Sequence, residues 1–329
     1  MSPRQVVLSC LRERLMTIQT PIIGIDVAKE NLSLYRLDTQ QSATLANDRR
    51  TIVTWLKTLP ADCAVAIEAT STYHVLLADL AYQCGHRIYV IDGYRLSNYR
   101  KGIGGRAKTD QSDARLLARY LAHEQNQLHP WSPACKAYRR LQLLLRRRAT
   151  LVRSATALRL SFAQDRQMAR ELKPVLERIK RLERRLNEQV HKALQDAGLA
   201  EQAKRCQAIE GIGPLTAAAL NLAFLRGSFR NSDAFIAFLG LDVRVKESGR
   251  YSGRRKLSKQ GDSEIRRLLH NAAMAASRTA AWQQRYQQYL QRGLKRTEAL
   301  VILARKLARI AFALMKTQQP YRPAVDTVG

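Results

Sequence analysis

Two acidic residues, Asp26 and Glu68, each end a short apolar run bounded by turn-forming residues. These runs, at residues 21–25 and 63–67, predict buried strands. A carboxylate at the end of a buried strand is withdrawn from water, so it needs a cation or hydrogen-bond donors as compensation. A bound metal ion would supply that compensation. The alternative interpretation is that Asp26 only forms the turn that ends its strand.

Two further acids, Asp110 and Asp113, lie three residues apart at the start of a helical stretch. This spacing places both carboxylates on one helix face. Together with Asp26 and Glu68 they would chelate two Mg²⁺ ions, the arrangement that stabilises attacking and leaving oxygens in phosphodiester chemistry. Alternatively, Asp110 caps the helix after Thr109 and Asp113 complements the helix dipole. We favour metal binding because all four acids occur together in a strongly basic chain.

Composition indicates the partner. The chain of 329 residues has 56 Lys and Arg against 27 Asp and Glu, a formal net charge of +29. This excess favours nucleic acid over an acidic small molecule. A membrane surface is the competing partner, but we find neither a run of about 18 apolar residues nor a signal peptide. The five cysteines have no metal-ligand or disulfide spacing. We therefore expect a reduced protein of the bacterial cytoplasm, associated with the nucleoid and without a membrane partner.

Residues 21–128 predict an α/β domain. Strands are expected at 22–25, 32–37, 43–45, 64–68 and 87–91, and helices at 50–59, 73–84 and 110–121. The opening hairpin, with acids at later strand ends, resembles the ribonuclease H fold. In that fold Asp26 lies on the first strand and Glu68 on the fourth, adjacent in the sheet. Residues 1–20 are expected to form an N-terminal extension.

Residues 129–200 predict a basic coiled-coil hairpin. Between 136 and 195 there are 17 Lys or Arg but 5 Asp or Glu, with apolar residues at helical spacing. Pro174 is expected to divide this stretch into two antiparallel arms. One interpretation is dimerisation alone, but a structural coiled coil usually balances its flanking charges. The excess of arginine favours phosphate contact. The candidate contacts are Arg146, Arg147 and Arg148.

Residues 201–320 predict a mainly helical C-terminal domain, followed by a tail at 321–329. Gly211 and Gly213 lie in a tight turn between two expected helices. This pattern resembles a helix-hairpin-helix element, whose turn amides bind a backbone phosphate. The alternative is an ordinary turn between packed helices.

A loop at 246–262 contains Ser248, Ser252 and Ser258 among six Lys or Arg, before a helix that begins at Asp262 or Ser263. A hydroxyl that attacks phosphorus must lose its proton and reach a bound phosphate, which suits a flexible cationic loop. The residues alone leave the three serines equivalent. The candidate phosphate contacts here and before the first helical acid are Lys108, Arg250, Arg254, Arg255 and Lys259.

Five segments together carry a resemblance to a known family. They are residues 24–29, 67–73, 108–115, 209–213 and 247–261. In this order they resemble the DEDD transposases of the insertion sequence 110 family, over residues 21 to about 320. The chain departs from the family pattern in its extra N-terminal residues and in Ser71, where the family often has glycine.

The resemblance implies a RuvC-like catalytic domain, a coiled coil that mediates assembly, and a C-terminal transposase domain. It implies that Asp26, Glu68, Asp110 and Asp113 bind Mg²⁺ and that Ser248 is the nucleophile. We therefore predict a DNA recombinase that acts on donor and target DNA as a dimer or tetramer, with a guide RNA as a further partner. The alternatives are a RuvC-like nuclease that uses water, and a nonenzymatic nucleic-acid-binding protein.

Overall fold

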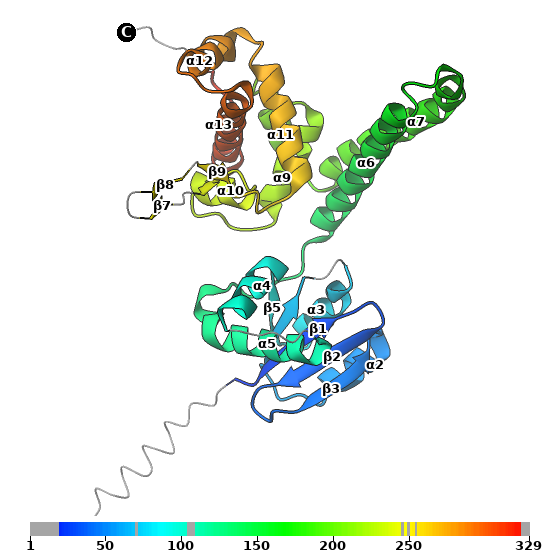
Figure 1. Cartoon of the computed structure of the whole chain (residues 1–329), viewed down its shortest axis with the longest axis vertical. Helices are drawn as coiled ribbons and strands as arrows, with labels where there is room; N and C mark the ends of the chain where they lie inside the picture. Colours follow the sequence, from blue (N-terminus) through cyan, green and yellow to red (C-terminus); the bar gives the residue numbers. More distant parts are fainter. Residues whose placement is uncertain are drawn as a thin grey trace, which may run out of the picture. The chain divides into compact units, whose positions relative to one another are not determined.

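The chain forms two compact units, residues 1–133 and 134–329 (Figure 1). The structure is a computed structural model, and it describes residues 20–69, 72–103, 109–244, 247–248, 251–253 and 255–323. Most of the predicted N-terminal extension and most of the C-terminal tail lie outside these residues.

The first unit is built on a five-stranded mixed sheet with strand order β3-β2-β1-β4-β5. Its strands are β1 (Ile22–Val27), β2 (Asn31–Arg36), β3 (Ser42–Ala46), β4 (Ala64–Glu68) and β5 (Arg87–Ile91). The first three strands are antiparallel, whereas β4 and β5 run parallel to β1. All five predicted strands are present, and the sheet fits a ribonuclease H-like domain.

Helices cover both faces of this sheet. One face packs on α2 (Arg49–Leu56) and α3 (His74–Gln83), and the other on α4 (Gly93–Gly102) and α5 (Asp110–Glu124), which is followed by the short η1 (Gln125–Gln127). The sequence analysis missed α4. Leu96 is the one buried residue of this fully described helix, so α4 has almost no apolar periodicity to recognise.

Close backbone contact holds α5 against the centre of the sheet. A Cβ atom added to Gly24 of β1 would lie 2.0 Å from the Ala114 carbonyl oxygen and 2.5 Å from the Ala118 nitrogen. No side chain fits in that space. Glycine at this position therefore sets the distance between β1 and the helix that carries Asp110 and Asp113.

We expect Gly24→Ala to lower the free energy of unfolding by at least the upper end of the ~1–3 kcal/mol that overpacking usually costs. Urea unfolding of the full chain measures the effect. Gly102→Ala is the matched control, because a Cβ atom there meets nothing within 4 Å. Equal unfolding midpoints for the two variants would contradict the close approach of α5.

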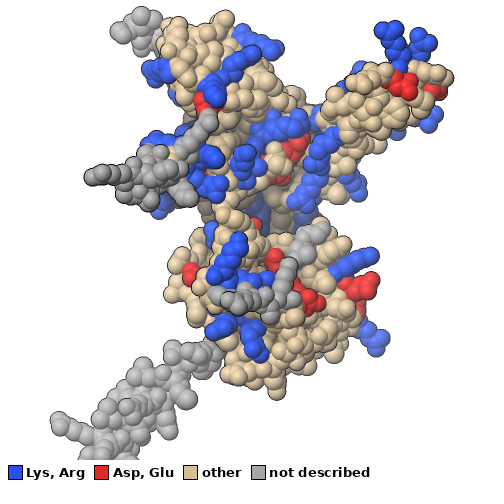
Figure 2. Space-filling model, in the orientation of Figure 1, with Lys and Arg blue, Asp and Glu red and all other residues tan. Residues whose placement is uncertain are grey.

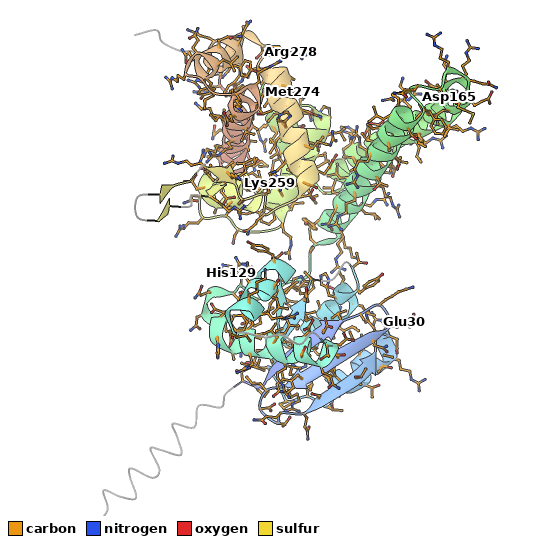
Figure 3. The ribbon with its side chains drawn as sticks, viewed as in Figure 1. Glu30, His129, Asp165, Lys259, Met274 and Arg278 are labelled. Atoms are coloured by element: carbon orange, nitrogen blue, oxygen red, sulfur yellow. The ribbon has the colours of Figure 1, made fainter. Side chains whose placement is uncertain are left out.

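The second unit begins with a long antiparallel helical hairpin, α6 (Lys136–Ser161) and α7 (Arg166–Asp196). The prediction that Pro174 divides the arms is wrong, because Pro174 lies inside α7. The turn occupies residues 162–165, and Asp165 at the hairpin tip accepts a hydrogen bond from the Met168 amide at 3.0 Å (Figure 3). A capped helix start fixes the turn here.

The remaining helices pack around α13 and share one core with the base of the hairpin. They are α8 (Ala200–Gln207), α9 (Pro214–Leu225), α10 (Ser232–Phe238), α11 (Ser263–Ala276), α12 (Ala280–Gln291) and α13 (Arg296–Thr317). Leu141 and Leu145 of α6 and Val190 and Leu194 of α7 belong to this core. In the part of the chain that the structure describes, no helix is long and apolar enough to cross a membrane.

Two small strand pairs lie between α10 and α11. They are β6 (Val243–Arg244) with β9 (Lys256–Leu257), and β7 (Glu247–Ser248) with β8 (Tyr251–Ser252). The segment predicted as a loop is therefore partly paired. The following helix begins at Ser263, and Asp262 is its N-cap, one of the two predicted caps.

Candidate active site

Asp26 and Glu68 lie at the same edge of the sheet. Ile25 of β1 pairs with Ile67 of β4 in parallel register, and each acid is the next residue along its strand. Because side chains alternate across a strand, Asp26 projects to the same face as Gly24, the face covered by α5. Asp26 is half-buried there. The sheet register thus brings two acids together that are far apart in the sequence.

The helix α5 adds the other two acids. Ala114 and Ala118 contact Gly24, and the later residues Leu117 and Leu121 pack in one cluster with Ile22. The helix therefore runs antiparallel to β1, and its first turn lies toward Asp26. That first turn carries an exposed Asp110 and a buried Asp113. We call Asp26, Glu68, Asp110 and Asp113 the acidic cluster.

The charges of the acidic cluster interact strongly. Burial and, to a smaller extent, the charges of Asp113, Asp110 and Glu68 in that order together raise the pKa of Asp26 to about 6, although a hydrogen bond from the Val27 amide lowers it. Negative charge at Asp26 is therefore unfavourable in the metal-free protein. A nearby cation would remove that penalty.

Two contacts from α4 reach the acidic cluster. Nη2 of Arg100 donates to Oδ1 of Asp113 at 2.6 Å, and 20% and 9% of these side chains are exposed. At the other end of α4, a Cβ atom added to Gly93 would lie 2.6 Å from Oε1 of Glu68. The sequence analysis named neither Arg100 nor α4. The basic residues of a polar helix give no sign of which acid they contact.

Helix α5 also bears on the alternative interpretations of its acids. Thr109, not Asp110, is the N-cap, and its hydroxyl oxygen accepts from the Ser112 amide at 3.2 Å. Among the described residues, no three His, Cys, Asp or Glu side chains stand as a ready-made metal site. The acidic cluster consists of carboxylates, the donors that Mg²⁺ takes from proteins.

The predicted nucleophile lies in the second unit. Ser248 is in β7 and pairs with Tyr251 of β8, while Ser252 pairs with Glu247. The third serine, Ser258, is engaged elsewhere, since its hydroxyl donates to the Asp242 carboxylate and its amide donates to the Asp242 carbonyl oxygen at 2.9 Å. Ser258 therefore differs from Ser248 and Ser252, because its hydrogen bonds to Asp242 link the segments next to β6 and β9.

Comparison with known proteins shows the family of the chain. Residues 23–164 match a family model described as a transposase, the DEDD transposase of IS110, and residues 203–288 match the transposase family IS116/IS110/IS902. The two matches cover about two thirds of the chain, and the first continues from the first unit through α6 of the second. The chain belongs to the insertion sequence 110 family of transposases.

The sequence similarity between this transposase and individual relatives extends over nearly the whole of both chains. The pilin gene-inverting protein of Moraxella bovis is 27% identical over 91% of this chain and 97% of the relative. A probable family 20 transposase of Pseudomonas aeruginosa is 28% identical over 92% and 98%. The transposase for insertion sequence element IS1328 of Yersinia enterocolitica is 27% identical over 89% and 96%.

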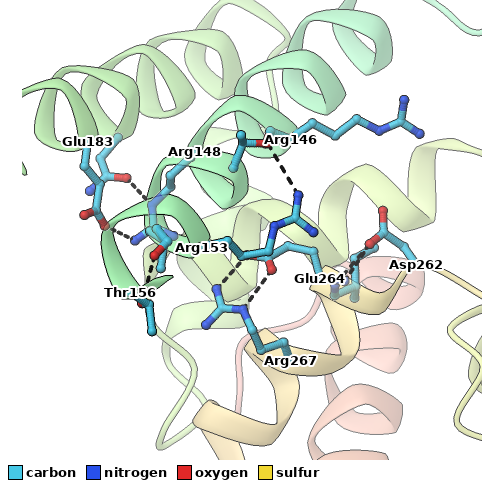
Figure 4. Close-up of polar contacts among 12 residues, drawn as sticks. Arg146, Arg148, Arg153, Thr156, Glu183, Asp262, Glu264 and Arg267 are labelled. Carbon is cyan, nitrogen blue, oxygen red and sulfur yellow. Dashed lines mark hydrogen bonds and ion pairs between the residues drawn. The ribbon is translucent and has the colours of Figure 1, made fainter. Parts of the chain in front are cut away.

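The basic residues predicted on the hairpin of this transposase differ in their contacts. Arg146 and Arg147 are exposed. Arg148 instead braces the hairpin, because it is paired with Glu183 and donates to the Asn187 side-chain oxygen at 2.8 Å (Figure 4). On the face shown in Figure 2, Lys and Arg outnumber Asp and Glu along the hairpin. Arg146 and Arg147 are thus better placed than Arg148 to meet phosphates.

The two predicted turn glycines, Gly211 and Gly213, differ in how closely other parts of the chain approach them. Gly211 has φ +88°, and a Cβ atom there would lie 2.4 Å from the Ala272 carbonyl oxygen of α11. Gly211 therefore permits close packing of the turn on α11. Gly213 is the N-cap of α9, and a Cβ atom there would meet nothing within 4 Å. Open space at the start of α9 leaves Gly213 accessible to a phosphate.

The remaining predicted contacts fall into two groups. Arg255 and Lys259 are exposed near β9, and Lys259 is labelled in Figure 3. The other three lie outside the described residues; they are Lys108, Arg250 and Arg254.

Proposed function

We propose that the protein is a Mg²⁺-dependent DNA transposase of an insertion sequence, with a RuvC-like catalytic domain and a serine nucleophile. The observation that carries this proposal is the convergence of Asp26, Glu68, Asp110 and Asp113 at one end of β1, β4 and α5. Family membership supports it, because the family comprises transposases. The net charge of +29 supports a polyanionic substrate.

The acidic cluster would hold the metal. Its members are all carboxylates, and the pKa of Asp26 is raised by burial and by the charges of the other three. Both properties fit a hard divalent cation. When bound, Mg²⁺ supplies charge stabilisation for the oxygens around the scissile phosphate. Helix α4 approaches two members of the cluster, Asp113 through the Arg100 guanidinium and Glu68 through the Gly93 backbone.

The proposed reaction is a transesterification at Ser248. The Ser248 hydroxyl loses its proton to a base, its Oγ forms a bond to phosphorus, and the phosphorus bond to one DNA oxygen breaks. The DNA leaves with a free hydroxyl, and the other DNA end stays joined to Ser248 as a phosphodiester. Attack by a hydroxyl of a second strand reverses these steps and releases Ser248. Each step exchanges one phosphate ester bond for another, so strand exchange needs no nucleotide hydrolysis.

The partners follow from the same proposal. Joining two duplexes requires several active sites, so we propose a homo-oligomer, a dimer or tetramer, assembled through the α6–α7 hairpin. We further propose a guide RNA, which the family resemblance implies. Sequence specificity would then reside partly in base pairing. Arg146, Arg147, Gly213, Arg255 and Lys259 are the proposed phosphate contacts among the described residues.

A metal titration tests the proposed function. The full chain is incubated with supercoiled DNA carrying the element's ends and with RNA transcribed from the flanking noncoding DNA, in Mg²⁺ and in excess chelator. We expect rejoined recombinant molecules in Mg²⁺ but not in chelator, because strand cleavage and strand transfer both need the metal. DNA binding needs no metal and should occur in both conditions. Breakage without rejoining would favour a RuvC-like nuclease. Equal binding without any breakage would favour a nonenzymatic protein.

A further inference from the structure

Beside the acidic cluster, at the start of α5, is a hollow of about 350 Å³. Three arginines line it: Arg100 from α4, and Arg115 and Arg119 from α5. Gln111 and Ser112 add polar groups to the lining. We call this space the arginine hollow. The arginine hollow adjoins the acidic cluster at Asp113. Ser112 is the neighbour of Asp113 in the sequence, and Arg100 forms an ion pair with Asp113.

Two arginines of the hollow, Arg115 and Arg119, differ from Arg100, which is paired with Asp113. Arg115 and Arg119 are exposed one helical turn apart, a like-charge spacing that destabilises a helix. The Arg115 guanidinium lies 4.9 Å from the ring centroid of Tyr35. In the part of the chain that the structure describes, neither Arg115 nor Arg119 is paired with an acid. Guanidinium groups that line one hollow suit a phosphate, which accepts their paired donors.

Arg100 belongs to both sites. Its guanidinium lines the arginine hollow and also donates to Oδ1 of Asp113 at 2.6 Å. A cation bonded to Asp113 competes with a metal ion for that carboxylate, because both are stabilised by the same negative charge. A phosphate in the arginine hollow would attract the same guanidinium from the other side.

We propose that the arginine hollow binds a DNA backbone phosphate next to the scissile phosphate, and that Arg100 exchanges between Asp113 and this phosphate. The inference rests on the proposed function, since it takes Asp113 as a metal ligand. Without DNA, Arg100 occupies Asp113 and weakens metal binding. With DNA in place, Arg100 moves to the phosphate and leaves Asp113 free for the metal. Metal and DNA binding are thereby coupled.

The first arm of the test measures Mn²⁺ binding to the full chain without DNA, by calorimetry. We expect Arg100→Gln to bind Mn²⁺ at least about tenfold more tightly than the parent, because the variant lacks one charge-assisted hydrogen bond that competes with the metal. Arg100→Lys, which keeps the charge, should bind like the parent. Arg50→Gln on α2, at the opposite face of the sheet, is the matched control and should change nothing. Unchanged or weaker Mn²⁺ binding by Arg100→Gln overturns the exchange.

The second arm measures DNA binding in chelator as a function of salt. We expect Arg115→Gln and Arg119→Gln each to weaken binding and to lower the slope of log K against log salt by about 1, because each removes one phosphate contact. Both side chains are exposed, so folding should be retained. Slopes equal to that of Arg50→Gln overturn the phosphate site. Weakened binding of an RNA hairpin with unchanged DNA binding overturns its assignment to DNA.

The two arms also separate this inference from the proposed function. A parent protein that binds no Mn²⁺ overturns the metal site and the exchange together. A parent protein that binds Mn²⁺ normally, with Arg100→Gln unchanged, overturns the exchange alone and leaves the acidic cluster as the metal site.

Discussion

Ser248→Ala is expected to abolish both DNA cleavage and the protein–DNA adduct that the proposed reaction forms. A water molecule in the vacated space lacks the tether that holds the serine hydroxyl in line with phosphorus. That positional advantage amounts to several kcal/mol, so cleavage should fall on the order of 10³-fold or more. The measurement is a denaturing gel of a Mg²⁺ reaction, in which the parent adduct survives denaturation and disappears with protease.

Two neighbouring serines are the controls for this experiment. Ser252 lies on β8, opposite Glu247 of β7, and Ser258 braces β6 against β9 through Asp242. Ser252→Ala and Ser258→Ala should therefore retain the adduct. If Ser248→Ala releases free DNA ends at the parent rate, and the parent shows no adduct, water is the nucleophile and the RuvC-like nuclease is the better description.

The second large effect is expected at the acidic cluster. Asp26→Asn, Glu68→Gln, Asp110→Asn and Asp113→Asn should each lower recombination on the order of 100-fold or more, because each removes an anionic ligand from the metal. DNA binding in chelator should persist. Asp38→Asn is the control, since Asp38 pairs with Arg36 away from the cluster. Recombination at more than a few per cent of the parent level in any two of the four variants would contradict the assignment of these residues as metal ligands.

Asp26→Asn should also stabilise the metal-free protein in a pH-dependent way. The folded-state pKa of Asp26, about 6, lies above its ordinary value of 3.8. Ionisation of Asp26 therefore opposes folding, and the parent loses stability as pH rises between about 4 and 6. The variant avoids this loss. After discounting for partial exposure, we expect a gain of ~1–2 kcal/mol at pH 7 and none below pH 4.

Urea unfolding in chelator at both pH values measures this gain. Added Mg²⁺ should reduce the difference in free energy of unfolding between Asp26→Asn and the parent, because a bound cation stabilises the ionised carboxylate of the parent. An equal gain at pH 4 and pH 7 would show that the substitution acts through packing and not through the charge of Asp26.

Much of the first unit was predictable from local patterns. The strands Ala64–Glu68 and Arg87–Ile91 have the predicted bounds, because each is a short apolar run between turn residues. The start of α5 at Asp110 was likewise recognisable, and Thr109 caps it. The hairpin turn was misplaced at Pro174, because α7 accommodates this proline in its interior and begins at the cap formed by Asp165.

Residue types and their local spacing thus determined the strands, the acids at their ends and the affinity for a polyanion. Only the tertiary structure decided that Arg100 meets Asp113, that α4 touches Glu68, and that Gly24 admits α5. The physical reason is that periodicity and capping act over a few residues, whereas Coulomb energies and close packing depend on distances between segments far apart in the sequence. A polar helix such as α4 carries no periodic signal, so its contacts emerge only when the sheet and α5 are assembled.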